Sequence, residues 1–139
     1  MDFRPYYEDK LWGSVLHLFC SSHAAVSCLE VVAGYRCSLH RHAERANMFA
    51  VQEGAVVIEE WDSFDQPKLI KLLHPGDIIT VSSRVWHRFR VLQSGRMVEV
   101  YWADRDDGKV RMDDIERDDI GGKDNLDELR AELFASGLL

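Results

Sequence analysis

Two histidines, His40 and His42, stand two residues apart, and a third, His87, follows in a later apolar segment. Side chains alternate faces along a β-strand, so His40 and His42 would point the same way from an extended segment. His87, from a second strand, could then complete a set of three imidazoles around one divalent metal ion. Three protein ligands leave positions open for substrate or water, unlike a structural site. The sequence therefore predicts a zinc, manganese, nickel or iron site, because imidazole accepts each of these metals.

Each of these residues also has a simpler structural interpretation. The pair His40 and His42 could instead be exposed or hydrogen-bonded on a strand, and Asn47 could bond a turn rather than offer a neutral carbonyl ligand. Glu99 lies between two valines, where burial would raise its pKa and make it a candidate general base. An ordinary edge glutamate is an equal alternative. His17 is interpreted as a structural histidine.

The elements that must position these residues are short apolar segments separated by turn signals. Breaks are expected at Gly34, Glu53-Gly54, 62–67, Pro75-Gly76 and 93–95. Eight strands are predicted, at 14–19, 24–33, 48–52, 55–61, 68–73, 77–81, 87–91 and 96–102. Residues 1–12 indicate an arm or edge strand. Many short strands at regular spacing favour an all-β antiparallel sandwich or barrel.

The composition changes after residue 103. Residues 104–119 are strongly acidic, which indicates a solvated loop. Asp124 or Asn125 could then cap a helix. Its apolar residues recur at helical spacing and are expected to pack on the barrel or on a second subunit: Leu126, Leu129, Leu133 and Phe134.

Length and charge limit the function classes. The chain has 139 residues, which favours one domain, and a formal net charge of -7. No basic face indicates nucleic-acid binding, and the negative charge disfavours an anionic membrane. The three cysteines form no CxxC pair, and no apolar run approaches the roughly 18 residues of a membrane helix. The first residues, Met-Asp-Phe-Arg-Pro, do not lead into an apolar stretch of the signal-peptide type, so we expect a cytoplasmic protein.

The histidines belong to a pattern that resembles the cupin superfamily. The first cupin motif is matched in spacing at Gly34, His40, His42, Asn47 and Gly54, with Asn47 where the family has a glutamate ligand. The second motif is matched at Gly76 and His87, whereas Ser82, Arg84 and Val91 replace its proline, glycine and asparagine. The resemblance covers about residues 30–92. It implies a double-stranded β-helix barrel and a metal held by His40, His42, Asn47 and His87.

A narrower resemblance is to the cupin-type phosphomannose isomerases and the C-terminal domain of mannose-1-phosphate guanylyltransferases. It rests on these segments: 11–14, 38–39, 45–47, 85–89, 98–100 and 113–117. The segment 119–122 reads Asp-Ile-Gly-Gly where that family has Asp-Tyr-Gly-Arg, so its phosphosugar arginine is missing. Lys123 could supply a cation there, although without a planar fork.

These patterns together predict one cupin domain over residues 1–139, with the barrel at about 10–103 and the acidic loop and helix at about 104–139. The family resemblance implies a metal-dependent aldose–ketose isomerase acting on mannose 6-phosphate, with Glu99 as base and Lys123 at the phosphate. A cupin that binds a sugar or another small molecule without turnover is one alternative, and an iron-dependent dioxygenase is another. A homodimer is expected, with Phe3, Tyr6 and Tyr7 as contacts.

Overall fold

The structure is a computed structural model that describes residues 3–65, 68–104 and 114–139. The described residues form eleven strands and one helix. Strands and helix are, in chain order, β1 Tyr6–Lys10, β2 Gly13–Cys20, β3 Ala24–Val31, β4 Tyr35–Arg36, β5 His40–His42, β6 Arg45–Trp61, β7 Leu69–Leu73, β8 Ile78–Val81, β9 Trp86–Ala103, β10 Ile115–Arg117, β11 Gly122–Lys123 and α1 Leu126–Ala135. The predicted all-β class with a C-terminal helix is confirmed.

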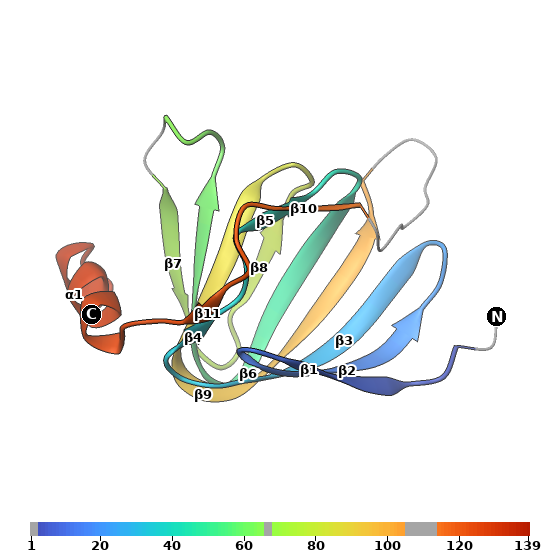
Figure 1. Cartoon of the computed structure of the whole chain (residues 1–139), viewed down its shortest axis with the longest axis horizontal. Coiled ribbons are helices and arrows are strands. Elements are labelled where there is room, and N and C mark those ends of the chain that lie inside the picture. The colour runs from blue at the N-terminus through green and yellow to red at the C-terminus, as the bar shows by residue number, and fades with distance from the viewer. Residues whose placement is uncertain (1–2, 66–67, 105–113) are drawn as a thin grey trace.

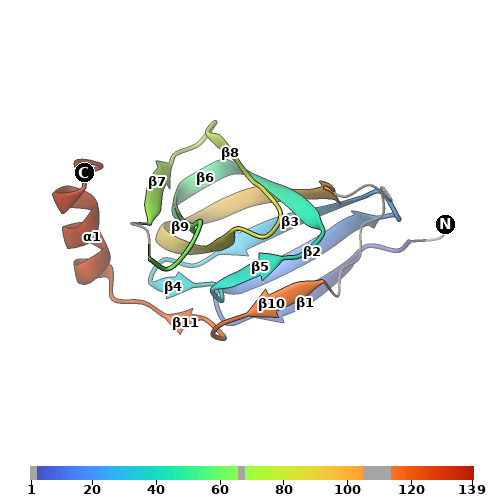
Figure 2. The ribbon, with the colours of Figure 1, turned by 90° about the horizontal axis from the view of Figure 1, so that it is seen from above.

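The strands form one antiparallel sheet that curls on itself (Figure 1). Strand β9 is central, because it pairs with β3, β4, β5 and β6. Strand β6 also pairs with β7 along one part of its length and with β8 along another. Seen from above, β6, β7 and β8 lie on one side of the barrel and β5 and β10 on the other (Figure 2). The curled sheet therefore surrounds an interior to which several strands contribute side chains.

Two predicted breaks are wrong. The segments 48–52 and 55–61 belong to one strand, β6, and the segments 87–91 and 96–102 belong to one strand, β9. The register between these strands shifts near Glu53 and Ala55, so the expected turns are bulges within a continuous pair. Gly54 has a φ of +84°, and a Cβ on Gly95 would lie 2.0 Å from the Glu53 carbonyl oxygen. Only glycine allows this close approach, which bends both strands together.

The described end of the acidic segment differs from the prediction. Ile115–Arg117 forms β10 and pairs with β5, so this part of residues 104–119 is a strand and not a loop. Residues 105–113 lie outside the described part of the chain. Residues 1–12 include β1, which pairs with β2 as the expected edge strand. Whether β1 also contacts a second copy stays a prediction.

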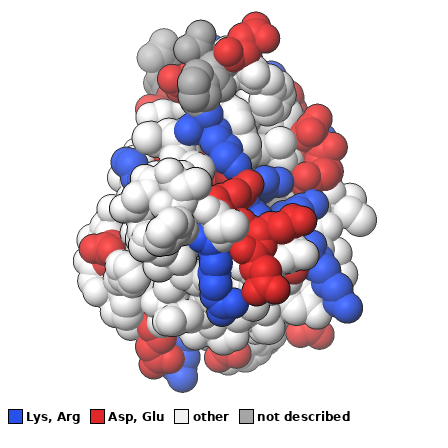
Figure 3. Space-filling view, turned by 90° about the vertical axis from the view of Figure 1, so that its left-hand side faces the viewer, with Lys and Arg blue, Asp and Glu red and all other residues white. Residues whose placement is uncertain are grey.

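Helix α1 begins and packs as the sequence predicts, with one exception. The side chain of Asn125 caps it by accepting from the Glu128 amide at 3.0 Å. Leu129 and Leu133 are buried in an apolar cluster on the outside of the barrel. Phe134 is 75% exposed, because it follows Leu133 and lies on a different side of the helix. Basic and acidic side chains lie side by side on the face of the molecule that carries α1 (Figure 3).

The main core lies inside the barrel. It consists of large apolar residues, including Trp12, Leu29, Phe49, Phe89 and Met97. Among the described residues, no helix is long and apolar enough to cross a membrane.

Candidate metal centre and cavity

The three predicted histidines lie together inside the barrel. His40 and His42 alternate along β5 and so share a face, and His40 is the direct register partner of His87 on β9. The ring centroids are 4.5 Å apart for His40 and His87, 5.0 Å for His40 and His42, and 5.5 Å for His42 and His87. One nitrogen of each ring lies within 4.8 Å of the other two. The predicted convergence of imidazoles is therefore present.

The turn before His87 has a backbone conformation that glycine usually adopts, although the sequence has no glycine there. Arg84, which stands where the family has glycine, adopts a φ of +67°. Its backbone amide donates to the His42 carbonyl oxygen at 2.7 Å. The left-handed conformation that glycine would supply is thus retained by an arginine, at a cost in local strain. The turn links the two histidine-bearing strands directly.

The environment of the cluster suits a metal. Burial lowers the pKa of His40 to about 3 and that of His87 to about 4, so both rings are neutral at pH 7. The Nδ1 atoms of His40 and His87 lie 2.6 and 2.8 Å from the Ser38 and Val85 carbonyl oxygens. These contacts place the ring protons on Nδ1 and leave the Nε2 lone pairs available. Nε2 of His87 is buried without a hydrogen-bond partner in the described structure.

His42 differs from its neighbours. Its Nδ1 accepts from Nε of Arg45 at 3.0 Å, and Arg45 also pairs with Asp114 at 3.0 Å. Burial and the charge of Arg45 both lower the pKa of His42. Nε2 of His42 is buried and also lacks a hydrogen-bond partner within the described residues. The donor set therefore fits a divalent metal. The Nε2 atoms of His40 and His87 are ready to bind it, whereas the position of the His42 ring proton depends on the contact with Arg45.

Asn47 and Glu99 form a second buried pair beside the histidines. Asn47 is fully buried on β6, and its side-chain amide donates to Glu99 Oε2 at 2.9 Å. The Asn47 carbonyl oxygen has no partner among the described residues, which leaves a lone pair for a metal or a ligand. Whether Asn47 binds the metal stays a prediction. Glu99 also bonds Tyr101, and burial raises the pKa of its carboxyl group.

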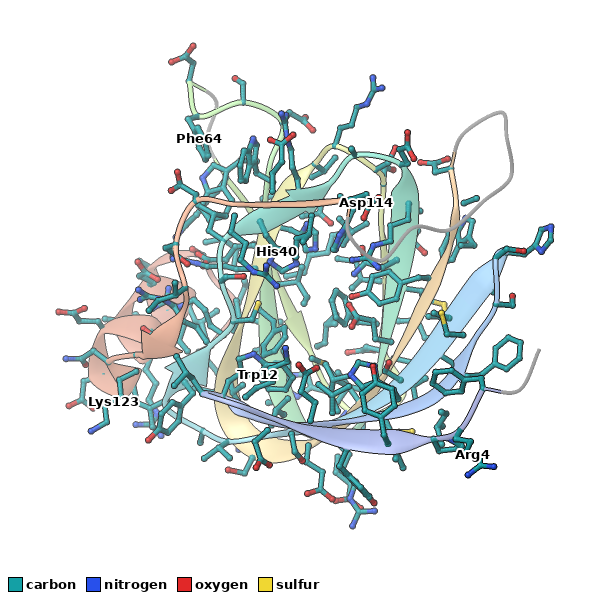
Figure 4. All side chains as sticks on the ribbon, turned by 45° about the vertical axis from the view of Figure 1, so that its right-hand side comes forward. Arg4, Trp12, His40, Phe64, Asp114 and Lys123 are labelled. Atoms are coloured by element: carbon teal, nitrogen blue, oxygen red, sulfur yellow. The ribbon has the colours of Figure 1, made fainter. Side chains whose placement is uncertain are left out.

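A cavity of about 390 Å³ lies beside the histidines of β5 and Glu99. His40, His42, Arg45, Glu99 and Tyr101 line it. The side chain of His40 lies within the curve of the sheet, above Trp12 (Figure 4). A space of this size is in the usual range for small-molecule sites.

Lys123 is not part of this cavity. It is exposed on β11, beside α1 and outside the curve of the sheet (Figure 4). The cations that do line the cavity are Arg45, Arg117 and Lys10. Arg117 is the register partner of His40, and none of the described residues forms an ion pair with it. Arg117 belongs to the segment 113–117 on which the narrower resemblance partly rests, but no role was predicted for it, because the pairing of β10 with β5 is not evident from composition.

The cavity has a polar wall that sequence analysis missed. Tyr6, Glu8, His17 and Ser27 line it, from strands β1, β2 and β3. His17 was interpreted as structural, yet its ring faces this space. The alternation of Tyr6, Glu8 and Lys10 on the expected edge strand was the available signal.

Comparison with known proteins identifies the fold. Neither family models nor curated protein sequences match this chain. Among solved structures, CapF, a capsular polysaccharide assembling protein of Staphylococcus aureus, matches with a TM-score of 0.66 and 16% identity over 84% of this chain and 32% of that chain. A mutant of Bacillus subtilis oxalate decarboxylase matches with a TM-score of 0.66 and 17% identity, over 84% of this chain and 30% of that chain.

A third match is KdgF from Halomonas sp., with a TM-score of 0.61 and 17% identity over 73% of this chain and 89% of that chain. All three are cupin-fold proteins. This chain has the cupin β-barrel fold. It spans about a third of the CapF and oxalate decarboxylase chains and is closer in extent to KdgF. Within this fold, the cluster of His40, His42 and His87 could hold a metal ion.

Proposed function

We propose that this protein is a metal-dependent aldose–ketose isomerase of the mannose 6-phosphate type. The observation that carries the proposal is that two buried imidazoles, His40 and His42, line the same cavity as the buried carboxyl group of Glu99. The third buried imidazole, His87, lies against His40. A metal held by His40, His42 and His87 would supply a Lewis acid able to polarise a carbonyl oxygen. Sugar isomerisation needs that polarisation and a base that moves one proton between neighbouring carbons.

Glu99 is suited to the role of the base. Burial raises the pKa of its carboxyl group towards the pH at which it would work. The amide of Asn47 and the hydroxyl of Tyr101 bond the carboxylate and fix its orientation. Glu99 would accept a proton from one sugar carbon and return it to the adjacent carbon. Its position in the cavity wall keeps this proton away from bulk water.

Arg117 is the residue that we assign to the phosphate. It lines the cavity next to His40, and its guanidinium group offers the planar fork that matches a phosphate. Lys123, the cation expected from the sequence, lies outside the cavity. Arg117 would therefore replace the arginine that the phosphomannose isomerase pattern has at the position of Gly122.

A second candidate function is binding of a sugar without turnover. The observation in its favour is the bond from Asn47 to Glu99, because an amide donor stabilises the carboxylate and weakens it as a base. Asn47 also removes the anionic ligand that most cupins have. The two candidates share the same cavity and differ only in whether Glu99 moves a proton.

The deciding experiment is isomerisation of mannose 6-phosphate by protein that is stripped of metal and reloaded separately with zinc, manganese, nickel or iron(II). We expect turnover with at least one metal, and a loss of about 100-fold or more in kcat for Glu99→Gln at unchanged metal content. Arg117→Met should raise KM, whereas the matched Lys123→Met should not. Absence of turnover with all four metals would reject the isomerase and favour the binding protein.

A further inference from the structure

The metal cluster occupies only one part of the cavity. A separate group of polar side chains projects from β1, β2 and β3 into the same space: Tyr6, Glu8, Lys10, His17 and Ser27. We call this group the β1 wall. None of its members is a predicted metal ligand, and the reaction proposed above uses none of them.

The β1 wall is held by its own contacts. His17 Nε2 lies 3.0 Å from Glu8 Oε1, and Lys10 Nζ lies 3.2 Å from the same oxygen. On its other side, His17 Nδ1 lies 3.4 Å from the Ser27 hydroxyl. The Tyr6 ring stacks on the His17 ring at 4.5 Å. These contacts orient a carboxylate, an ammonium, an imidazole and an aromatic ring together at the cavity.

The register of the sheet connects this wall to the proposed base. Tyr6 pairs with His17, His17 pairs with Ser27, and Ser27 pairs with Glu99. Residues directly opposite each other in antiparallel strands share a face. The β1 wall is therefore a continuation of the surface that carries Glu99. A ligand whose reactive end lies at the histidines and Glu99 would extend along this row.

The chemistry of the β1 wall selects among ligand groups. Glu8 carries a negative charge beside His17, since hydrogen bonding to His17 lowers the pKa of its carboxyl group. The Lys10 ammonium lies 3.2 Å from this carboxylate and is paired with it, so it is not a free cation for a phosphate or carboxylate. A carboxylate accepts hydroxyl protons, an ammonium donates to hydroxyl oxygens, and a tyrosine ring offers an apolar face to C–H groups. The combination suits a neutral, hydroxylated ring.

We propose that the β1 wall is a recognition subsite for the uncharged, hydroxyl-bearing part of a sugar, with Tyr6 as its packing face and Glu8 as its hydroxyl acceptor. This inference rests on the proposed sugar ligand and adds where the ring lies and which residues select it. It assigns the phosphate to the Arg117 side and the hydroxyls to the β1 side. The subsite is a binding element and does not require that Glu99 move a proton.

The test is binding of uncharged D-mannose to the zinc-loaded full chain, followed by NMR titration. We expect saturable binding that Tyr6→Ala and Glu8→Gln each weaken at least tenfold, with unchanged zinc affinity. The matched control is Tyr7→Ala, because Tyr7 is the next residue on β1, is 72% exposed and does not line the cavity. Thermal unfolding checks that each variant is folded.

The outcomes separate this inference from the proposed function. D-mannose binding that Tyr6→Ala and Glu8→Gln leave unchanged would overturn the subsite, as would the absence of saturable binding to the wild-type protein. Neither result bears on isomerisation of mannose 6-phosphate, which is measured separately. Conversely, selective weakening by both β1 variants in a protein without isomerase activity would support the subsite and reject the isomerase.

Discussion

The contact between His42 and Arg45 decides what the third histidine offers to a metal. Arginine has only donors, and two of its nitrogens lie 3.0 and 2.9 Å from His42 Nδ1. A neutral His42 must then carry its proton on Nε2, the atom that would bind the metal. Ligand histidines usually show the opposite arrangement, in which Nδ1–H donates to an acceptor. His40 and His87 follow that usual arrangement.

We therefore predict mixed tautomers in the metal-free protein, with protons on Nδ1 of His40 and His87 and on Nε2 of His42. Long-range ¹⁵N–¹H NMR spectra of the wild-type protein measure this directly. Arg45→Gln, which offers a carbonyl acceptor to His42, should tighten zinc binding by about tenfold. The control is Arg41→Gln, because Arg41 pairs with Glu116 instead. Three Nδ1-protonated rings in the wild-type spectrum would contradict the interpretation.

A second prediction at this scale concerns Asn47. Asn47→Glu should raise metal affinity at least tenfold, because it adds an anionic oxygen where the carbonyl oxygen of Asn47 has no partner. Without metal the same variant should be less stable than the wild type, since two carboxyl groups would meet at Glu99. Calorimetric titration and urea unfolding measure the two effects. An unchanged dissociation constant would show that the side chain at position 47 does not reach the metal.

The pair His40 and His42 could be predicted from sequence because its signal is local. His40 and His42 lie on one face of any strand, and the spacing to Gly34 and Gly54 fixes the motif. His17 and Arg117 could not be assigned in this way. They reach the cavity through the register of β1 on β2 and of β10 on β5, and no local pattern encodes either pairing.

At the scale of elements, most predicted strands are present, and the two wrong breaks have one cause. A glycine within an apolar run indicates a turn as readily as a bulge, so the sequence could not distinguish a hairpin from a bent strand at Gly54 and Gly95. The continuous pairing of β6 with β9 follows from long-range contacts. Helix α1 could be predicted from the sequence, because its cap at Asn125 and its leucine spacing lie within one short segment.

Helix α1 is fixed to the barrel by apolar packing and by buried ion pairs. Arg90 on β9 is 5% exposed and donates to Asp124 Oδ2 at 2.6 Å. Leu133 is fully buried against the sheet. We predict that Leu133→Ala lowers the free energy of unfolding by about 3 kcal/mol, because it leaves a cavity. The neighbouring Phe134→Ala, at an exposed site, should change it by less than about 0.5 kcal/mol. Urea unfolding compares the two, and equal losses would place Phe134 in an interface.

At the scale of the whole molecule, the buried histidines make stability depend on pH. In the unfolded chain a histidine binds a proton near pH 6.5, whereas burial lowers the pKa to about 3 for His40 and about 4 for His87. Between these values the unfolded state binds more protons than the folded state, so stability falls as pH falls. The pKa values of the Glu59 and Asp124 carboxyl groups are lowered in the folded protein. These groups therefore take up protons at a lower pH than the one at which the histidines change stability.

Metal-free protein should accordingly lose stability from pH 6.5 towards pH 4, by up to about 1.4 kcal/mol per pH unit for each buried histidine. Urea unfolding in the presence of EDTA at pH 7, 6 and 5 measures the slope. His87→Gln should reduce this slope by about one proton, because the variant has one fewer group to protonate on unfolding. His74→Gln, at an exposed turn, is the matched control and should leave it unchanged. Equal slopes for the wild type and His87→Gln would mean that His87 is already accessible to protons in the folded protein, and the closed, neutral cluster would then be wrong.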